Sequence, residues 1–496
     1  MLLHSYGTCP AILCARQECR ALWRKMDNQS DTIAAIATPA GEGGIAVIRV
    51  SGSKAGDIAR AVWRRMNRDD CPPLETHRVY HGHVINPETN AVIDECLLIY
   101  FEEGRSYTGD EVIEINCHGG PFVARRVLEA VLAAGARPAG PGEFTRRAFL
   151  AGRLDLAQAE AVADLIAASS DRELANARMQ LEGALSRQVG EVAERLTETL
   201  AEIESRIDFP EEEDIGALPT ERLKELLGAS HQKLTGLAEG FKEGRVLREG
   251  YRLTIVGRPN VGKSSLLNRL LGVDRAIVTA EAGTTRDVIE ERVVWRGMPF
   301  LLVDTAGVRN ARVGSPEYMA AEKSRERARY HAADPSGGVL LVVLDASEPL
   351  ADEDIEVLDM AREAPHLLIF NKCDLRGRIE PSKLPGPWRK EKAIHVSALT
   401  GEGMKSLVDA VARRREEGGL AAKSEGYLLS SARHYAAVKR AIEAVNLATA
   451  ALNEGRPHEI IALEVRLARE ALDGIVGAAG VEDVLDIIFS RFCIGK

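Results

Sequence analysis

The sequence predicts a multidomain protein with an N-terminal α/β domain, an α-helical bundle domain and a P-loop α/β domain inserted into the helical region. Three observations carry this prediction. Short alternating strands with glycine turns fill the first part of the chain, and apolar residues recur at helical spacing on both sides of residues 250–415. Between these helical segments, a glycine-rich GKS loop joins a short apolar run to a helical pattern.

The expected domain boundaries follow these changes of pattern. They give an N-terminal extension at residues 1–25 and an α/β domain at 26–145. The helical domain follows in two parts, at residues 146–249 and 416–496, and the inserted domain lies between them at 250–415. The basic residues of the extension are opposed only by Glu18, which allows a presequence. The segment is poor in serine, so we favour an upstream extension before a true start at Met26.

Local patterns predict the main elements. Residues 43–52, 97–101 and 111–120 alternate as strands do, and residues 121–137 form an amphipathic helix closed by Gly135. A last amphipathic helix is expected over residues 481–492. Further along the chain, an apolar stripe at helical spacing is expected to pack inside the bundle: Val192, Leu196, Leu200, Ile203 and Ile207.

Composition excludes several classes of protein. The 496 residues are 45% hydrophobic and 28% charged, with a net charge of −10, so the whole molecule is not a basic nucleic-acid binder. No apolar run approaches the roughly 18 residues needed to span a bilayer, and no membrane association is expected. The eight cysteines are dispersed without CxxC spacing, which indicates a reduced, cytoplasmic protein.

The most informative motif is GRPNVGKSS at residues 257–265. It follows the apolar run Leu253–Val256 and opens into a helical pattern, which is the context of a phosphate-binding loop. Its glycines let backbone N–H groups point at phosphate oxygens. Lys263 is expected to reach the outer phosphates and Ser264 to ligate Mg²⁺. The chain is therefore predicted to bind a nucleoside triphosphate.

Four further motifs narrow the nucleotide to GTP. An apolar strand ends in DTAG at residues 304–307, a second ends in NKCD at 371–374, and a third ends in Ser-Ala-Leu at 397–399. The loop EAGTTRD at residues 281–287 lies where a first switch is expected. The order of these motifs resembles that of a Ras-like GTPase domain, in which Asn371 and Asp374 would read guanine and Lys372 would pack beside the base. The expected GTP-binding residues are Asn260, Val261, Gly262, Lys263, Ser264, Ser265, Thr279, Ala280, Glu281, Ala282, Gly283, Thr284, Thr285, Asp304, Thr305, Ala306, Gly307, Asn371, Lys372, Cys373, Asp374, Ser397, Ala398 and Leu399.

One expected feature is missing. Ras-like GTPases orient the attacking water with a glutamine after DxxG, but Val308 stands there and cannot form a hydrogen bond. Another group must therefore position the water and neutralise the developing charge. Asn260 lies inside the phosphate loop, where its side-chain oxygen could hold a potassium ion against the phosphates.

Motifs outside the inserted domain make the resemblance more specific. The chain has ATPAGEGGIAVIRVSG near its start, RLDLAQAEAVADLI at the opening of the helical region and FCIGK at residues 492–496. With GTTRD and DTAG between them, these motifs resemble the tRNA-modification GTPase family called MnmE or TrmE. The resemblance covers residues 26–496.

The resemblance implies a function and partners. Family members act as homodimers and form a heterotetramer with MnmG, a flavin-dependent partner. The complex adds a carboxymethylaminomethyl or aminomethyl group at C5 of the wobble uridine of certain tRNAs. It uses GTP and a one-carbon unit from 5,10-methylene- or 5-formyl-tetrahydrofolate, which the N-terminal domain is expected to bind. Potassium stimulates hydrolysis as two GTPase domains meet.

The resemblance also places ligands on this chain. Mg²⁺ is expected at Ser264 and Thr285, and the potassium ion is expected at Asn260, Thr279, Glu281 and Thr284, with only the backbone carbonyl of Glu281 involved. The folate contacts are expected at Arg49, Glu114, Arg153 and Lys496. Arg153 stands where many members have lysine, and both residues are cationic.

Three residues are catalytic candidates by the same resemblance. Cys493 is either a buried structural thiol or a functional thiol near the one-carbon site, and we favour the second interpretation. A glutamate after DTAG is expected to act on the nucleophile through bridging water. The segment is longer here than in the family, so its register leaves Glu322 as first candidate and Glu317 as second.

Two alternatives remain open at this point. A ribosome-assembly GTPase of the Era or Der type would share the inserted domain, but it would lack the N-terminal domain and the terminal cysteine. A folate-dependent one-carbon transferase with a regulatory GTPase would have nearly the same parts. It would differ mainly in having carbon transfer, and not GTP hydrolysis, as its main activity. The acidic balance of the chain argues against the first alternative.

Overall fold

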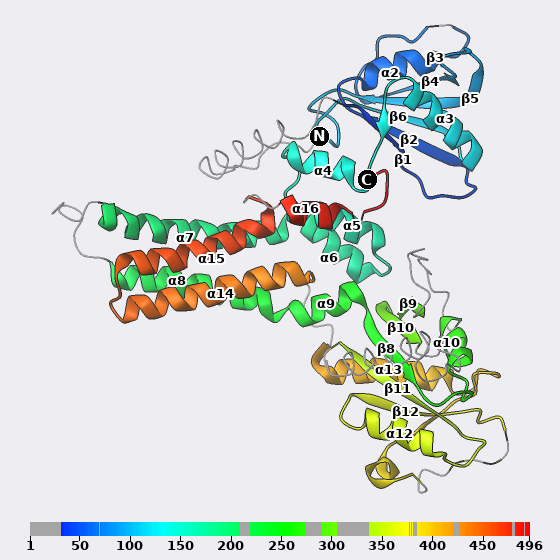
Figure 1. The fold of residues 1–496 in the computed structure, drawn as a ribbon, viewed down its shortest axis with the longest axis vertical. Coiled ribbons are helices and arrows are strands. Elements are labelled where there is room, and N and C mark those ends of the chain that lie inside the picture. Colours follow the sequence, from blue (N-terminus) through cyan, green and yellow to red (C-terminus); the bar gives the residue numbers. More distant parts are fainter. Residues whose placement is uncertain are drawn as a thin grey trace, which may run out of the picture. The chain divides into compact units, whose positions relative to one another are not determined.

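The computed structural model describes residues 31–496 except 69, 209–218, 273–288, 305–336, 376, 378, 380–383, 421–425, 479–481 and 491. The chain divides into two compact units. The first comprises residues up to 163, 181–197 and 466–496, and the second comprises 164–180 and 198–465. Each unit contains one β-sheet (Figure 1). No helix within the described ranges is long and apolar enough to cross a membrane.

The first unit is built on a seven-stranded sheet with the order β3-β4-β5-β6-β2-β1-β7. Neighbouring strands are antiparallel, except that β1 and β7 are parallel. The strands are β1 (Ile33–Ile36), β2 (Ile45–Ser51), β3 (Trp63–Arg65), β4 (Arg78–Ile85), β5 (Val92–Phe101), β6 (Val112–His118) and β7 (Arg137–Pro138). The strands expected at residues 43–52, 97–101 and 111–120 are confirmed as β2, part of β5 and β6.

One face of this sheet is covered by two helices, α2 (Ala55–Val62) and α3 (Pro121–Ala133) (Figure 1). Alternation along β2 places Ala46, Ile48 and Val50 in the core beneath them. The predicted helix is therefore confirmed as α3. It ends as expected, since Gly135 adopts a φ of +111° just beyond it.

The helical region contains helices before and after the inserted domain. They are α4 (Glu143–Leu150), α5 (Leu156–Ala167), α6 (Asp171–Leu181), α7 (Ala184–Asp208), α8 (Thr220–Glu239), α9 (Phe241–Glu249), α14 (Ala432–Asn453), α15 (His458–Val476) and α16 (Glu482–Phe489). Helices α8 and α14 lie side by side, although the inserted domain separates them in sequence (Figure 1). The side chain of Asn176 accepts from Leu428 N at 2.8 Å and donates to Leu428 O at 3.1 Å.

Two helix predictions are refined by the structure. The stripe along α7 is buried at Val192, Leu196, Leu200 and Ile203, as expected for a core face. The last helix, α16, is shorter than the expected range of 481–492, because the chain turns after Phe489 with a hydrogen bond from Phe492 N to Phe489 O.

The inserted domain has a six-stranded sheet with the order β13-β12-β11-β8-β10-β9. All neighbours are parallel except β9 and β10. The strands are β8 (Tyr251–Val256), β9 (Ile289–Trp295), β10 (Met298–Asp304), β11 (Gly338–Asp345), β12 (His366–Asn371) and β13 (Ile394–His395). Strand β11 is buried along its whole length, which is typical of a parallel sheet covered on both faces.

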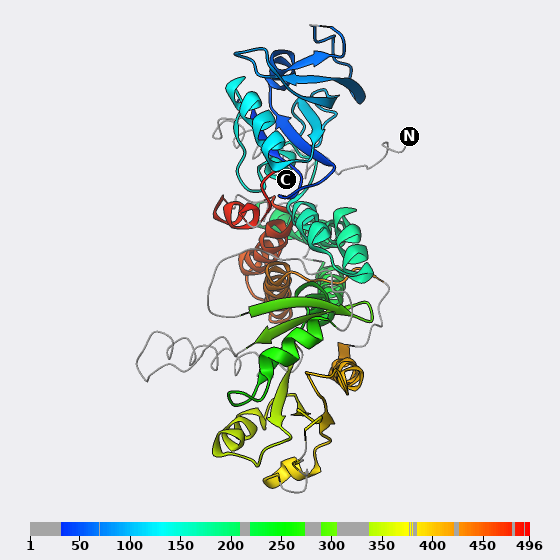
Figure 2. The same cartoon turned by 90° about the vertical axis from the view of Figure 1, so that its right-hand side faces the viewer.

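Helices pack on both faces of this sheet (Figures 1 and 2). One core includes residues of α10 (Lys263–Leu271) and α13 (Met404–Arg415). The other includes residues of α12 (Asp352–Ala361) and the 3₁₀ helix η3 (Gly386–Lys390). A short π-helix, η4 (Glu416–Leu420), continues α13. The carboxyl ends of the parallel strands therefore meet at one edge, where ligands bind in folds of this class.

Strand β9 attaches the inserted domain to the helices that precede it. Arg292 Nη2 lies 2.8 Å from Glu173 Oε2 of α6 and donates to the carbonyl of Arg248 in α9 at 2.7 Å. Arg248 in turn pairs with Asp164 of α5 at 2.9 Å. Glu173 is buried, so this pair is shielded from solvent and fixes β9 more firmly than an exposed pair would.

Candidate functional site

The phosphate loop lies between β8 and α10, as the sequence predicts. Gly262 adopts a φ of +95° and Asn260 a φ of +66°, which curl the backbone ahead of the N-terminus of α10. Lys263 Nζ donates to the carbonyl oxygens of Gly257 and Arg258, each at 2.8 Å. The ammonium is thus held across the loop by neutral acceptors, which bound phosphate oxygens can replace.

Asn371 at the end of β12 joins the phosphate loop to the loop after β13. Its Nδ2 donates to the carbonyl of Val261 at 2.8 Å, and its Oδ1 accepts from Ala398 N at 3.0 Å. The side chain is 1% exposed. Gly262 packs so closely on it that a Cβ there would lie 2.4 Å from Asn371 Nδ2. Residue 262 is therefore restricted to glycine both by its φ and by this contact.

Lys372 follows Asn371 and pairs with a buried carboxylate. Its Nζ lies 2.6 Å from Asp345 Oδ2 at the end of β11. Burial raises the pKa of Asp345, but the hydrogen bonds from Lys372 and Ser347 together hold it below its ordinary value. Lys372 itself has a φ of +64°. The pair fixes the backbone just before Asp374, whose side chain is exposed at the same edge.

The loop after β13 completes this edge. Only Ile394 and His395 form a strand, because the chain turns from Ser397 onward: Thr400 N donates to Ser397 Oγ at 3.1 Å, and Gly401 N donates to Ser397 O at 2.8 Å. Cys373 N also donates to Val396 O at 3.2 Å. The NKCD and Ser-Ala-Leu segments are thereby brought together beside the phosphate loop.

Several predicted site residues lie outside the described part of the chain. They include both switch segments and both candidate catalytic glutamates, and only the strand position of Asp304 is described. The residues outside the description are Thr279, Ala280, Glu281, Ala282, Gly283, Thr284, Thr285, Thr305, Ala306, Gly307, Val308, Glu317 and Glu322. Of the expected Mg²⁺ and potassium ligands, Ser264 and Asn260 are described, and both are exposed at the phosphate loop.

A second cluster lies in the first unit and contains three of the four predicted folate contacts. Arg49 of β2 and Glu114 of β6 are cross-strand neighbours, and Arg49 Nη2 lies 2.8 Å from Glu114 Oε1. Arg49 Nη1 also donates to the carbonyl of Gly495 at 3.2 Å. The guanidinium lies over the ring of Phe144 in α4, 5.7 Å from its centre.

The last residues of the chain close this cluster. Phe144 N donates to Lys496 O at 3.2 Å, and Pro141 and Ile494 form a β-bridge. Burial lowers the pKa of Lys496, and the neighbouring charge of Arg49 lowers it further. Two cations and one carboxylate therefore meet here, an arrangement that suits a ligand with both anionic and hydrogen-bond-donating groups.

Cys493 and Arg153 occupy different environments from this group. Cys493 is exposed, which excludes the disfavoured alternative of a buried structural thiol, whereas its role as a functional thiol stays a prediction. Arg153 is exposed and donates to the carbonyl of Gly104 at 2.8 Å, whereas Arg49 pairs with Glu114 and both charges act on the pKa of Lys496. The structure thus brings three predicted folate contacts together and gives the fourth a separate partner.

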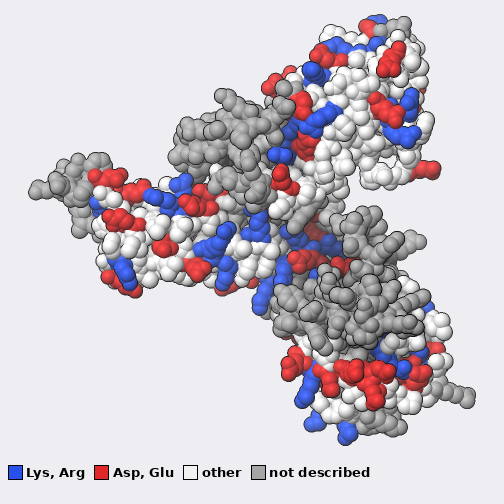
Figure 3. Space-filling model, viewed as in Figure 1, with Lys and Arg blue, Asp and Glu red and all other residues white. Residues whose placement is uncertain are grey.

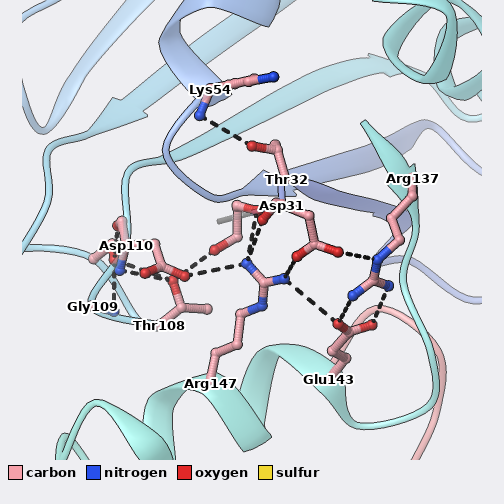
Figure 4. Close-up of polar contacts among 11 residues, drawn as sticks. Asp31, Thr32, Lys54, Thr108, Gly109, Asp110, Arg137, Glu143 and Arg147 are labelled. Carbon is pink, nitrogen blue, oxygen red and sulfur yellow. Dashed lines mark hydrogen bonds and ion pairs between the residues drawn. The ribbon is translucent and has the colours of Figure 1, made fainter. Parts of the chain in front are cut away.

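A buried arginine supports the sheet beside this cluster. Arg147 of α4 is 6% exposed and lies among the carboxylates of Asp31, Asp110 and Glu143 at 2.8, 3.4 and 3.6 Å (Figure 4). Arg137 also bonds to Asp31 and Glu143. This network attaches α4, which carries Phe144, to the edge of the sheet.

Sequence reasoning missed several residues that shape these sites. Asp345 ends an apolar run, a pattern that could have been read as another strand-end carboxylate. Arg258 pairs with Glu348 at 2.5 Å and with Asp354 at 3.1 Å, and no local pattern signals those partners. On the face in Figure 3, Lys and Arg side chains are interspersed with Asp and Glu.

Comparisons with known proteins match this chain to one family along most of its length. A family model described as GTP-binding protein TrmE N-terminus matches residues 32–153, and one described as MnmE helical domain matches residues 156–493. A tRNA modification GTPase MnmE of Geotalea uraniireducens is 42% identical over 94% of this chain and 99% of its own length. Proteins of that name from Clostridioides difficile and Lactiplantibacillus plantarum are 41% and 39% identical, each over 94% of this chain and at least 98% of their own.

Proposed function

The chain belongs to the MnmE family of tRNA modification GTPases, and we propose that it acts with a flavin-dependent partner, MnmG, on the wobble uridine of certain tRNAs. As a GTPase, it hydrolyses GTP. In the proposed reaction, the complex adds a carboxymethylaminomethyl or aminomethyl group at C5 of that uridine, and a tetrahydrofolate supplies the one-carbon unit. The site of action is the cytoplasm, and the working form is a homodimer within a heterotetramer.

One observation carries the GTP part of this proposal. Through Asn371, the phosphate loop and the Ser-Ala-Leu loop are held at the end of β12, and Asp374 is exposed beside them. A carboxylate there can accept from the N1 and 2-amino groups of guanine, which adenine does not offer. The arrangement can therefore bind phosphates and select the base at one edge of the sheet.

Residues of the chain have separate proposed tasks during hydrolysis. Lys263 exchanges its two carbonyl partners for phosphate oxygens and neutralises charge that develops on them. Ser264 and Thr285 would hold Mg²⁺, which would supply charge neutralisation during phosphoryl transfer. Asn260, Thr279, Thr284 and the backbone carbonyl of Glu281 would hold potassium, which would supply the charge neutralisation that an arginine gives in other GTPases. Glu322, or in the other register Glu317, orients the attacking water.

The cluster around Arg49 supports the folate part. Lys496 and Arg49 offer cations to folate carboxylates, and Glu114 offers an acceptor for pterin N–H groups. Cys493 is exposed close by, as a functional thiol requires. Arg153 is proposed as a further cation at the rim of this site. The Era or Der alternative is disfavoured because the N-terminal and helical regions match the MnmE family as well.

The decisive experiment is nucleoside analysis of tRNA from cells that lack this chain. The modified wobble uridine should disappear and return when the wild-type gene is restored. A ribosomal precursor that accumulates beside normally modified tRNA would contradict the proposal. In a purified system, GTP hydrolysis should be faster in potassium than in sodium buffer, and equal rates would contradict the potassium assignment.

A further inference from the structure

We propose that Arg269 is a positioning residue for base recognition, which fixes the Ser-Ala-Leu loop so that the N–H of Leu399 is available to the C6 carbonyl of guanine. This inference rests on the proposed use of GTP. Arg269 lies on α10, the helix that begins with the phosphate-loop lysine, and no predicted motif included it. Its importance is visible only in the contacts that it makes after folding.

Arg269 holds two successive carbonyl groups of the loop. Its Nε donates to Ala398 O at 2.9 Å, and its Nη2 donates to Leu399 O. Hydrogen bonds from a charged donor are stronger than those between neutral groups. The backbone N–H of Ala398 is bound as well, since it donates to Asn371 Oδ1 at 3.0 Å. The loop is therefore fixed from α10 and from β12 at the same time.

These contacts leave one donor of the loop unused. Ala398 N is engaged by Asn371, and Thr400 N is engaged by Ser397 Oγ at 3.1 Å. Within the described residues, Leu399 N has no hydrogen-bond partner. A peptide group is planar and trans, so the Leu399 N–H points away from the Ala398 carbonyl that Arg269 binds. Fixing that carbonyl toward α10 therefore orients the free N–H to the other side.

The side chain of Leu399 agrees with this assignment. It is 77% exposed although it is apolar, and it lies on the same loop as the free N–H. A flat purine ring can cover an apolar side chain while its carbonyl accepts a hydrogen bond from the adjacent backbone. The position next to Asp374 and the phosphate loop is where the base of a bound nucleotide must lie.

The test compares Arg269→Ala with the wild-type protein on GTP, ITP and ATP. ITP keeps the C6 carbonyl of GTP but lacks the 2-amino group, and ATP has an amino group at C6. We expect the KM for GTP and for ITP to rise about tenfold, with kcat unchanged at saturation, because a loosened loop donor weakens binding to the shared carbonyl. The affinity for ATP, measured by its competition with GTP, should stay the same, so the preference for GTP over ATP should fall about tenfold.

Two further variants separate this role from a general loss of structure. Arg389 Nε donates to the carbonyl of Leu384 at 2.7 Å in another loop of the same domain, so Arg389→Ala is the matched control and should keep the wild-type KM. Asp374→Ala should weaken GTP binding more than ITP binding, unlike Arg269→Ala. Arg269→Lys retains one cationic donor and should give an intermediate KM, and it replaces the alanine variant if that protein does not fold.

The outcomes distinguish the inference from the function on which it rests. A wild-type KM and base preference in Arg269→Ala would overturn the role of Arg269. The same holds if kcat falls while KM stays constant, or if Arg389→Ala raises KM equally. If the wild-type protein itself shows no preference for GTP over ATP, the proposed function is wrong, whatever the variants do.

Discussion

The nucleotide site and the Arg49 cluster are assembled in opposite ways. The nucleotide site takes its parts from loops that follow neighbouring strands of one sheet, so each part has a local sequence motif. The Arg49 cluster joins β2 to residues at the other end of the chain, and the hydrogen bond from Arg49 to Gly495 spans 446 positions. No local sequence pattern at Arg49 or at Gly495 indicates that the two residues will be partners.

The difference teaches where sequence reasoning is sufficient. A P-loop domain repeats a strand–loop–helix solution, and each loop can be assigned from residues that lie a few positions apart. A site closed by a distant segment can be assigned only from a related family or from the folded structure. The two sites should also respond independently to substitution, and the following predictions test that independence in order of decreasing effect.

The largest effect is expected for Lys263→Ala. Its kcat/KM for GTP should fall by about 10²–10³, since a preorganised cationic donor to the phosphates is lost. Tetrahydrofolate binding, measured by fluorescence, should not change, because Lys263 donates to carbonyl groups of its own phosphate loop, and none of the predicted folate contacts lies in that loop. Lys405→Ala, at an exposed position on α13, is the control. Hydrolysis within threefold of the wild-type rate would contradict the assignment.

Asn371→Ala should destabilise the inserted domain by about 2 kcal/mol even without nucleotide. The substitution leaves the buried carbonyl of Val261 and the N–H of Ala398 without their partner. Urea unfolding of nucleotide-free protein measures this, since no base contact contributes there. Asn371→Asp keeps an acceptor for Ala398 N and should lose only the hydrogen bond to the Val261 carbonyl. Equal unfolding free energies for wild type and Asn371→Ala would show that the loops are held by other contacts.

Arg49→Ala should release the end of the chain and weaken tetrahydrofolate binding about tenfold. The substitution removes the hydrogen bond to Gly495 and the ion pair with Glu114. The side chains of Arg49 and Glu114 are 18% and 21% exposed, so their loss should lower the free energy of unfolding by about 1 kcal/mol. Hydrogen exchange at residues 492–496 should accelerate while GTP hydrolysis stays unchanged. Arg105→Ala, which removes an exposed pair with Glu102, should alter neither property. Unchanged exchange in Arg49→Ala would mean that Arg49 does not hold the tail.

The smallest effect concerns acid stability of the first unit. Burial raises the pKa of Asp31, but the hydrogen bonds and charges of Arg137 and Arg147 outweigh it and hold that pKa below its ordinary value. Burial also raises the pKa of Glu143, and the hydrogen bonds from Arg137 and Gly140 outweigh it and hold that pKa below its ordinary value. A carboxyl group whose pKa is lower in the folded than in the unfolded protein stabilises the folded state at pH above its unfolded pKa. This stabilisation disappears as the pH falls through its folded pKa.

Asp31→Asn should therefore lower the free energy of unfolding by about 0.5 kcal/mol at pH 7, a small value because Asp31 is one-third exposed. The difference between the two proteins should shrink below pH 4. Thermal unfolding monitored between pH 3 and pH 7 gives this comparison. A difference that grows as the solution becomes more acidic would have the wrong sign for this network.

Local patterns predicted the fold class and most strands, because alternation and glycine turns act over a few residues. They predicted the phosphate loop and the polar ends of β12 and of the loop after β13 for the same reason. They did not predict the contacts of Asn371 or Arg269, since those depend on which loops become neighbours after folding. The family resemblance supplied Lys496, but it did not indicate that Arg153 would bond to Gly104 instead of joining Arg49.

The closing of the Arg49 cluster by Gly495 and Lys496 bears on how the protein is made and handled. The sheet that carries Arg49 leaves the ribosome long before the residues that cover it. A chain cut short by a few amino acids would keep its sheet and its GTPase domain and still expose this arginine to water. A tag fused after Lys496 would extend from the residue whose carbonyl accepts from Phe144 N, so tags for biochemical work belong elsewhere.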